Sequence, residues 1–261
     1  MNFSKLIFSA VAASMVFAAH ASIYGMDFPS GVTDGTYATN NGGGEIKRVR
    51  TTFNQEAKEL WFEAVFGNVP GTSNKTDAFT LALSPGPNPK GHPGELALYY
   101  FDGNAAGGPA LTAYAYNGQN SATSYYDGNG TGAAPDKIKS SKTDSSFVQQ
   151  LYMNTTASGD RVLGFKIKTD AIDGHSPALG VPGEWTGSQY GQHLGIWMHQ
   201  RSGTTSSYGS DGFLTSFSSQ CEGWLDGANI STRLVPEPAS VLTIALGMGV
   251  FALRARARRN K

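Results

Sequence analysis

The stretch KELWFEAVF, residues 58–66, decides the fold. Its side chains alternate, with Leu60, Phe62 and Ala64 at the even positions and Trp61, Glu63 and Val65 at the odd positions. Successive side chains of a β-strand point to opposite faces, so this pattern predicts a strand with one apolar face.

The same kind of alternation recurs along the chain. Further strands are expected at residues 77–84, 95–103, 110–118, 146–154, 161–170, 193–201, 212–219 and 228–235. No segment shows the sustained 3.6-residue apolar period of a helix. Short strands with one apolar and one polar or aromatic face favour antiparallel pairing. We therefore expect an all-β fold, an antiparallel β-sandwich of jelly-roll or lectin-like layout.

Two segments are less regular. Residues 25–45 are polar and rich in glycine, and they form either an edge strand or a loose lead-in. Cys221, the only cysteine, lies in SSQCEGW, which has the composition of a turn. A single cysteine excludes an intrachain disulfide, so a packed core must stabilise the fold. The thiol is expected to be buried and inert; catalysis would require a neighbouring base.

The N-terminal residues 1–21 have the features of a secretory signal peptide. One lysine precedes an apolar run from Leu6 to Ala18, and Ala19-His20-Ala21 follows. Small residues at Ala19 and Ala21 fit a signal-peptidase site, which predicts cleavage after Ala21. A transmembrane anchor or a buried helix is the alternative. The body is then residues 22–234, and it is expected to be exported.

Charge is distributed unevenly although the whole chain is formally neutral. Residues 22–234 contain 19 acidic and 14 basic side chains, which gives them a net charge of −5. An acidic body argues against nucleic acid or an anionic surface as a partner.

Catalytic motifs are missing from the sequence. Polysaccharide hydrolysis requires two carboxylates at defined spacing. Glu59 and Glu63 share a strand face but would lie about 13 Å apart. We therefore expect a non-catalytic body, and a secreted hydrolase or lyase with a dispersed active site stays open as the alternative.

A structural calcium ion is the one cofactor that the composition allows. Five aspartates are expected at strand ends: Asp77, Asp102, Asp127, Asp211 and Asp226. Carboxylates in loops are calcium ligands, but Asp-Gly is also a common turn pair, so no ligand set follows from the sequence.

Aromatic residues are the candidates for ligand stacking. Tyr114 and Tyr116 lie on one face of an expected strand, and Trp61 and Trp197 stand opposite apolar residues on theirs. Flat rings on a solvated sheet face can stack against sugars. Aromatic residues in strands also serve in packing, which is the alternative.

The C-terminal segment VPEPASVLTIALGMGVFALRARARRNK, residues 235–261, combines three parts in order. Pro236-Glu237-Pro238 comes first, and the prolines keep it extended. The apolar run 241–253 would form a helix of about 20 Å, short for a hydrocarbon core of about 30 Å. A basic end follows, which holds the terminus in the cytoplasm.

These parts closely resemble the bacterial PEP-CTERM sorting signal, which an exosortase processes. The resemblance covers residues 235–261 alone. It implies a Gram-negative host that makes exopolysaccharide, transient insertion in the inner membrane, and delivery of the body to the cell surface or matrix. The triplet Pro236-Glu237-Pro238 would be recognised, and the stop would be formed by Arg254, Arg256, Arg258 and Arg259. An ordinary single-pass anchor is the alternative.

The sequence thus predicts an exported surface or matrix protein. Its body would bind extracellular polysaccharide or have a structural role in exopolysaccharide or biofilm, and its processing partner would be an exosortase.

Overall fold

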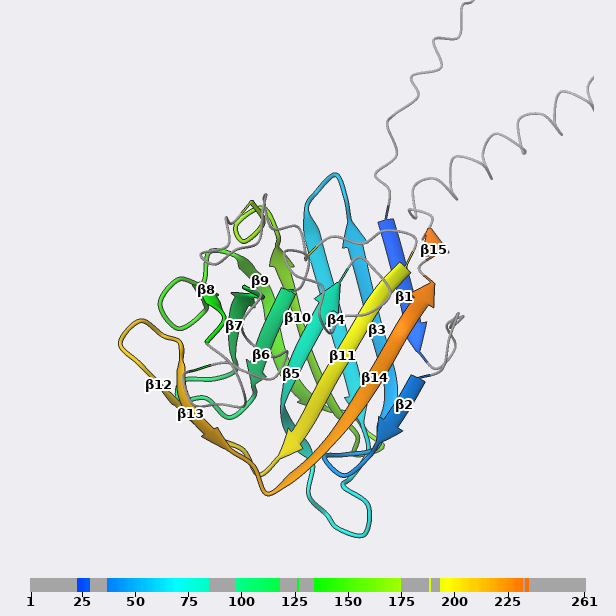
Figure 1. Ribbon diagram of the computed structural model, residues 1–261. Helices are drawn as coiled ribbons and strands as arrows, with labels where there is room; N and C mark the ends of the chain where they lie inside the picture. The colour runs from blue at the N-terminus through cyan, green and yellow to red at the C-terminus, as the bar shows by residue number, and fades with distance from the viewer. Residues whose placement is uncertain are drawn as a thin grey trace, which may run out of the picture.

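The computed structural model describes residues 23–28, 37–84, 97–117, 126, 134–174, 188, 193–231 and 233–234. These residues form antiparallel β-strands without a helix, which confirms the all-β prediction (Figure 1). The predicted signal peptide, the sorting signal and the predicted helix 241–253 lie outside the described residues. Within the described part of the chain, no helix is long and apolar enough to cross a membrane.

The strands form two large sheets and a hairpin. The first sheet has the order β15 (Arg233–Leu234), β1 (Ile23–Phe28), β3 (Ile46–Asn54), β4 (Glu59–Phe66), β10 (Arg161–Lys168) and β9 (Val148–Thr155). The second has the order β2 (Tyr37–Asn40), β14 (Cys221–Ser231), β11 (His193–Ser202), β5 (Thr76–Ser84), β6 (Ala97–Asp102), β7 (Ala110–Ala115) and β8 (Asp136–Ser140). The hairpin pairs β12 (Thr205–Tyr208) with β13 (Leu214–Ser218).

The two large sheets enclose an aromatic core. In β4 the burial alternates as predicted, with Leu60, Phe62 and Ala64 fully buried. Phe62 meets Phe79 of the second sheet at a ring-centroid distance of 5.5 Å, and Phe79 stacks on Phe101 at 5.0 Å. The alternation of β4 therefore determines which face of the first sheet packs against the second sheet.

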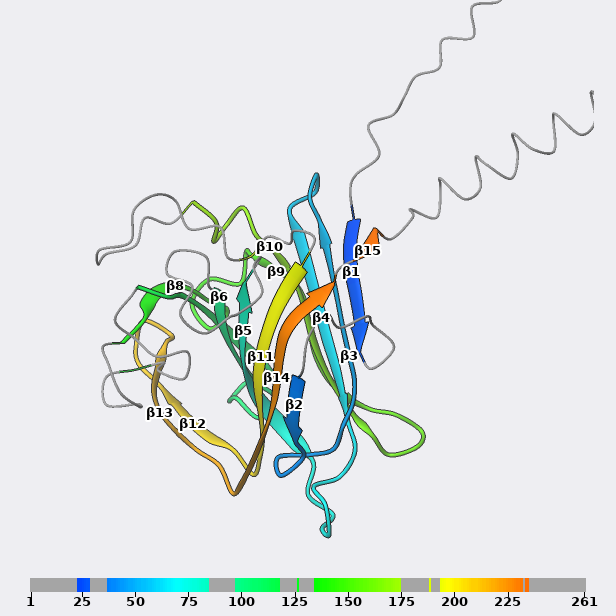
Figure 2. The ribbon, with the colours of Figure 1, turned by 45° about the vertical axis from the view of Figure 1, so that its right-hand side comes forward.

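A second apolar cluster lies on the other side of the seven-stranded sheet. The hairpin covers β6 to β8 there, as Figure 2 shows. Phe213 contacts Tyr114 edge-on at 5.3 Å, and Phe217 stacks on Tyr100 at 5.5 Å. As a result β5, β6 and β7 are buried on both faces. The face of these strands that was expected to be polar or aromatic is not exposed to solvent, because sequence-distant residues cover it.

Several strands were missed or misplaced. β3, β8 and β12 were not predicted. Their outward residues are Lys, Arg, Ser and Thr, so the apolar alternation is weak. Residues 25–45 overlap β1 and contain β2, an edge strand of the seven-stranded sheet, in agreement with the edge-strand alternative. Cys221 begins β14 instead of lying in a turn. The Cys221 thiol is half-buried rather than buried.

The two ends of the body meet at one sheet edge. Tyr24 in β1 pairs with Leu234 in β15, and Gly25 pairs with Arg233 (Figure 1). The predicted signal-peptidase site and the Pro236-Glu237-Pro238 triplet each lie within a few residues of this pairing. Both predicted processing segments therefore join the folded body at the same place.

The turn before β3 packs directly on β11 and β14. Gln200 donates from Nε2 to the carbonyl oxygens of Asn40, at 2.8 Å, and Gly44, at 3.2 Å. A Cβ at Gly43 would lie 2.1 Å from the carbonyl oxygen of Gln200. Only glycine allows this close approach of two backbones.

We therefore predict that Gly43→Ala lowers the free energy of unfolding by about 3 kcal/mol or more, because backbone must move to admit the methyl group. Urea denaturation measures the change. Gly71→Ala is the control: its φ is 75° and nothing lies within 4 Å of the added Cβ. It should cost about 1 kcal/mol, for the backbone conformation alone. Equal losses in the two variants would contradict the packing argument.

Candidate functional site

The candidate site lies on the outer face of β11 and β14. Residues of β14 alternate, so Glu222, Trp224 and Asp226 point outward while Gly223 and Leu225 are buried. Antiparallel pairing places them opposite outward residues of β11: Glu222 faces Arg201, Trp224 faces His199, and Asp226 faces Trp197. Two neighbouring strands thus bring charged and aromatic side chains into three adjacent rows.

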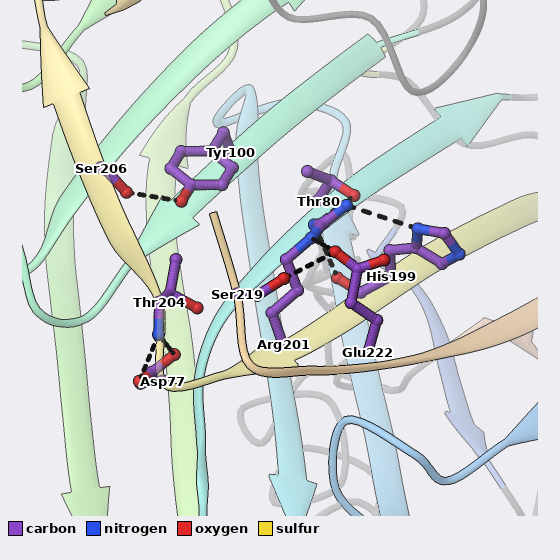
Figure 3. A network of polar contacts seen from close by, with 9 residues as sticks. All are labelled: Asp77, Thr80, Tyr100, His199, Arg201, Thr204, Ser206, Ser219 and Glu222. Atoms are coloured by element: carbon purple, nitrogen blue, oxygen red, sulfur yellow. Dashed lines mark hydrogen bonds and ion pairs between the residues drawn. The ribbon is translucent and has the colours of Figure 1, made fainter. Parts of the chain in front are cut away.

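Arg201 is the buried centre of this face. Its side chain is 4% exposed, and Nε donates to Oε1 of Glu222 at 3.1 Å. Nη1 donates to Oγ1 of Thr80, at 3.2 Å, and to the carbonyl oxygen of His199, at 3.4 Å (Figure 3). The fork of the guanidinium therefore joins β5, β11 and β14.

The contact between Arg201 and His199 indicates the tautomer of a neutral imidazole. Nη2 of Arg201 lies 3.4 Å from Nδ1 of His199 (Figure 3). Arginine has only donors, so Nδ1 must accept, and the ring proton of neutral His199 is on Nε2. Protonation of Nδ1 would remove this acceptor beside a permanent cation.

The hairpin closes over the other side of Arg201. The guanidinium lies 4.6 Å from the ring centroid of Phe217. Phe217 stacks on Tyr100, whose hydroxyl forms a 2.7 Å hydrogen bond with Ser206 of β12 (Figure 3). Burial raises the pKa of Tyr100, and the Ser206 bond opposes that shift only in part. Tyr100 is therefore a neutral structural group that joins the sheet to the hairpin.

Three rings form an aromatic strip beside this network. We define it as Trp197, His199 and Trp224; the first two ring centroids are 4.5 Å apart and the last two 6.2 Å apart. Trp197 is buried and His199 half-buried, whereas Trp224 is 38% exposed. Among the described residues, no other large hydrophobic side chain is as exposed as Trp224. The strip thus ends in one solvent-facing ring on a rigid, buried base.

Glu222 gives this ring a negatively charged neighbour. Its side chain is 49% exposed, and Oε1 also accepts a 2.6 Å hydrogen bond from Oγ of Ser219. Burial alone would raise the pKa of Glu222, but the Ser219 bond and the charge of Arg201 outweigh it and lower the pKa. Glu222 is therefore an ionised acceptor at neutral pH.

Two of the aspartates considered as calcium ligands already accept hydrogen bonds from protein donors. Asp77 accepts from the backbone N–H of Thr204, at 3.1 Å (Figure 3). It also accepts from Asn104 Nδ2, at 2.8 Å. Asp102 accepts from the Tyr208 hydroxyl at 2.8 Å. These bonds fasten the hairpin to the sheet end. Donors occupy the oxygens that a cation would need.

Among the residues that the structure describes, the other candidates for calcium do not add a ligand set. Asp211 accepts from Lys137 at 2.7 Å, Asp226 lies beside Trp224, and Asp127 falls outside the described residues. No group of three or more metal-ligating acidic, histidine or cysteine side chains occurs among the residues that the structure describes.

Of the four residues predicted to stack on ligand, the structure gathers three at one apolar cluster and places the fourth on the other sheet. Tyr114 and Trp197 lie in the second apolar cluster, 0% and 4% exposed, and Tyr116 packs against the same cluster. Trp61 is half-buried on the outer face of the other sheet, where its Nε1 donates to the Tyr152 hydroxyl at 3.2 Å. The solvated aromatic face expected for Tyr114 and Trp197 is therefore wrong, because the fold covers both rings.

Sequence reasoning missed Trp224, His199, Arg201 and Glu222 as a group. The available signal was the alternation Glu222-x-Trp224-x-Asp226, which was hidden because SSQCEGW, the stretch that contains Glu222 and Trp224, was assigned to a turn. The pairing of β11 with β14 depends on long-range register, which the local pattern does not contain.

A polar groove of about 860 Å³ lies at another place on the body. The β4–β5 and β9–β10 connections line it, together with Asn41, Glu45 and Lys47. Lys47 and Asp160 form part of its wall, where Nζ of Lys47 pairs with Oδ1 of Asp160 at 2.7 Å. None of the residues predicted from the sequence to bind ligand lines this groove.

Comparison with known proteins gives no assignment. The chain matches no protein-family model, no curated protein and no solved structure. The function must therefore be argued from the site.

We predict that Arg201→Lys lowers the free energy of unfolding by about 3 kcal/mol. Lysine keeps the charge but lacks the planar fork that reaches Glu222, Thr80 and Phe217 together. Denaturant unfolding measures the loss. Arg50→Lys is the matched control, because Arg50 pairs with Asp27 at 3.3 Å and is 37% exposed. It should change stability by less than about 1 kcal/mol; a similar loss in both variants would contradict the role of Arg201.

Proposed function

We propose that the protein is an exported, non-catalytic β-sandwich of lectin-like layout that binds glycan on the outer face of β11 and β14. The observation that carries the proposal is the exposed Trp224 ring, held beside His199 and flanked along β14 by Glu222 and Asp226. The C–H face of a sugar ring is apolar and packs on an indole. Its hydroxyl groups can donate to neighbouring carboxylates.

The rigidity of the base supports binding. His199 is held between Trp197 and Trp224, and Arg201 lies beneath the hairpin with its hydrogen bonds made. A preformed surface loses little conformational entropy when a ligand binds. A polymer of repeating units such as a polysaccharide can then be held through a few contacts repeated along its length.

The carboxylate spacing favours binding over hydrolysis. Glu222 and Asp226 are four residues apart on one strand, so their backbones are separated by about 13 Å. Glycosidase carboxyl groups lie about 5 to 9.5 Å apart. Release of reducing sugar, or of unsaturated sugar, from the host's exopolysaccharide would favour the enzyme alternative instead.

We predict that Trp224→Ala weakens glycan binding by about tenfold or more, because truncation of a stacking ring commonly costs over 1 kcal/mol. Affinity electrophoresis of the full chain, kept soluble by mild detergent, in gels with a broad set of polysaccharides gives the measurement. Trp61→Ala is the control on the opposite sheet and should bind normally. Loss of binding in Trp61→Ala alone would place the site on the other face, and failure of the full chain to slow in every gel would contradict glycan binding.

We also propose that the tail is a sorting signal of the PEP-CTERM type, removed by an exosortase after transient insertion in the inner membrane of a Gram-negative bacterium. The order of Pro236-Glu237-Pro238, apolar run and arginines supports the proposal. The pairing of β1 with β15 is compatible with it, since β15 ends at Leu234, two residues before the triplet in the sequence. The body would then reach the cell surface or matrix, where the glycan is.

Mass spectrometry of surface material from the native host tests this proposal. We predict mature chains that begin at Ser22 and lack Arg254 to Arg259. Surface chains with intact C-terminal arginines would contradict sorting and favour an ordinary anchor.

A further inference from the structure

The edge strands of the two large sheets differ in how they are protected from pairing with another chain. Among the residues that the structure describes, β15 and β2 are short, with two and four residues. β8 carries Lys137 and Lys139. β9 is an edge strand of eight residues, VQQLYMNT, with no charged residue and no proline. Shortness and charge are the usual protections of a sheet edge, and β9 has neither.

The backbone of β9 is regular along most of the strand. It pairs with β10, and the register shifts only between Lys166 and Ile167, opposite the start of β9. Residues 150–155 are therefore paired without interruption. In the part of the chain that the structure describes, no strand pairs with the other side of β9. The backbone on that side can accept a further strand.

The longer polar side chains of β9 reach back over the sheet. A Cβ added to Gly164 of β10 would lie 2.5 Å from Cζ of Tyr152, so the Tyr152 ring covers Gly164. The Tyr152 hydroxyl then donates to Oε2 of Glu63 in β4 at 2.8 Å. Gln149 also reaches β4, where its Nε2 donates to Oε1 of Glu59 at 2.7 Å. These side chains are directed away from the open edge and do not shield its backbone.

The side-chain pattern of β9 is complementary to itself. Leu151 and Met153 pack on the core, whereas Gln150 and Asn154 are exposed. A two-fold axis at Tyr152 would pair two antiparallel copies of the strand. Leu151 of one copy would then face Met153 of the other, and Gln150 would face Asn154. Apolar residues meet on the core side and amides on the outer side, and no like charges face each other.

We propose that β9 pairs with β9 of a second copy of this chain, so that two six-stranded sheets become one continuous sheet. The same symmetry at β8 would place Lys137 opposite Lys139, which opposes pairing there. The Trp224 face belongs to the other sheet, so this pairing does not use it. One pair of strands makes a small interface, and the association is therefore weak and depends on concentration.

Charges at the exposed positions of β9 test this pairing. The double substitution Gln150→Lys with Asn154→Lys places lysine opposite lysine twice in the dimer. Sedimentation of the full chain in mild detergent, over a range of protein concentrations, measures the dissociation constant. We expect the lysine variant to associate about tenfold more weakly than the unaltered chain, or worse. Gln55→Lys with Glu56→Gln is the control: it changes the net charge equally, in the exposed turn between β3 and β4, and should not weaken association.

A mixture of complementary variants separates pairing from misfolding. Gln150→Glu with Asn154→Glu should also associate weakly alone. Mixed with the lysine variant it should form a heterodimer at least as tight as the unaltered dimer, because lysine then faces glutamate. Recovery in the mixture requires both variants to be folded.

Three results would overturn the proposal. The unaltered chain could stay monomeric at every concentration, which would leave the edge for a strand of a different protein. The lysine variant could dimerise as well as the unaltered chain, which would place the contact elsewhere. The two variants could each keep the circular dichroism of the unaltered chain and still fail to pair when mixed. None of these results affects the proposed glycan binding, which Trp224→Ala tests separately.

Discussion

The burial of the Arg201 guanidinium is the interaction on which the outer face depends. A charge removed from water costs several kcal/mol unless good partners receive it. Here Glu222, Thr80 and His199 receive the hydrogen bonds, and Phe217 covers the planar group. These partners come from four strands. The Arg201 side chain therefore fixes the register of β11 against β14 and β5, and it also fixes the position of the hairpin on the sheet. The aromatic strip is aligned by the same register.

The hairpin also explains why only part of this face is available to a ligand. It leaves β11 after Ser202 and returns to β14 at Cys221, and it covers the side of β6 to β8. Tyr100, Tyr114 and the carboxylates of Asp77 and Asp102 are used in fastening it. The opposite side, with β14 and β2, keeps Trp224 in solvent. The hairpin thus buries one part of this sheet face and leaves the other part exposed to solvent.

The sequence predicted what depends on local alternation and missed what depends on distant chain segments. Leu60, Phe62 and Ala64 point to the core because neighbouring residues determine their side. Tyr114 and Trp197 have the same strand pattern as a solvated face, but residues of the hairpin, including Phe213 and Leu214, bury their cluster. Trp224 was invisible as a candidate because its partner His199 lies on another strand. Burial and cross-strand pairing are properties of the fold rather than of a sequence window.

The most direct test of the account is a fluorine NMR titration of the protein labelled with fluorotryptophan. The chain has four tryptophans, so each resonance can be assigned by single substitution. We predict that a bound glycan shifts the Trp224 resonance while that of Trp61, on the opposite sheet, stays in place. A shift confined to Trp61, or glycan binding that leaves Trp224 unchanged, would contradict the assignment of the site to β11 and β14.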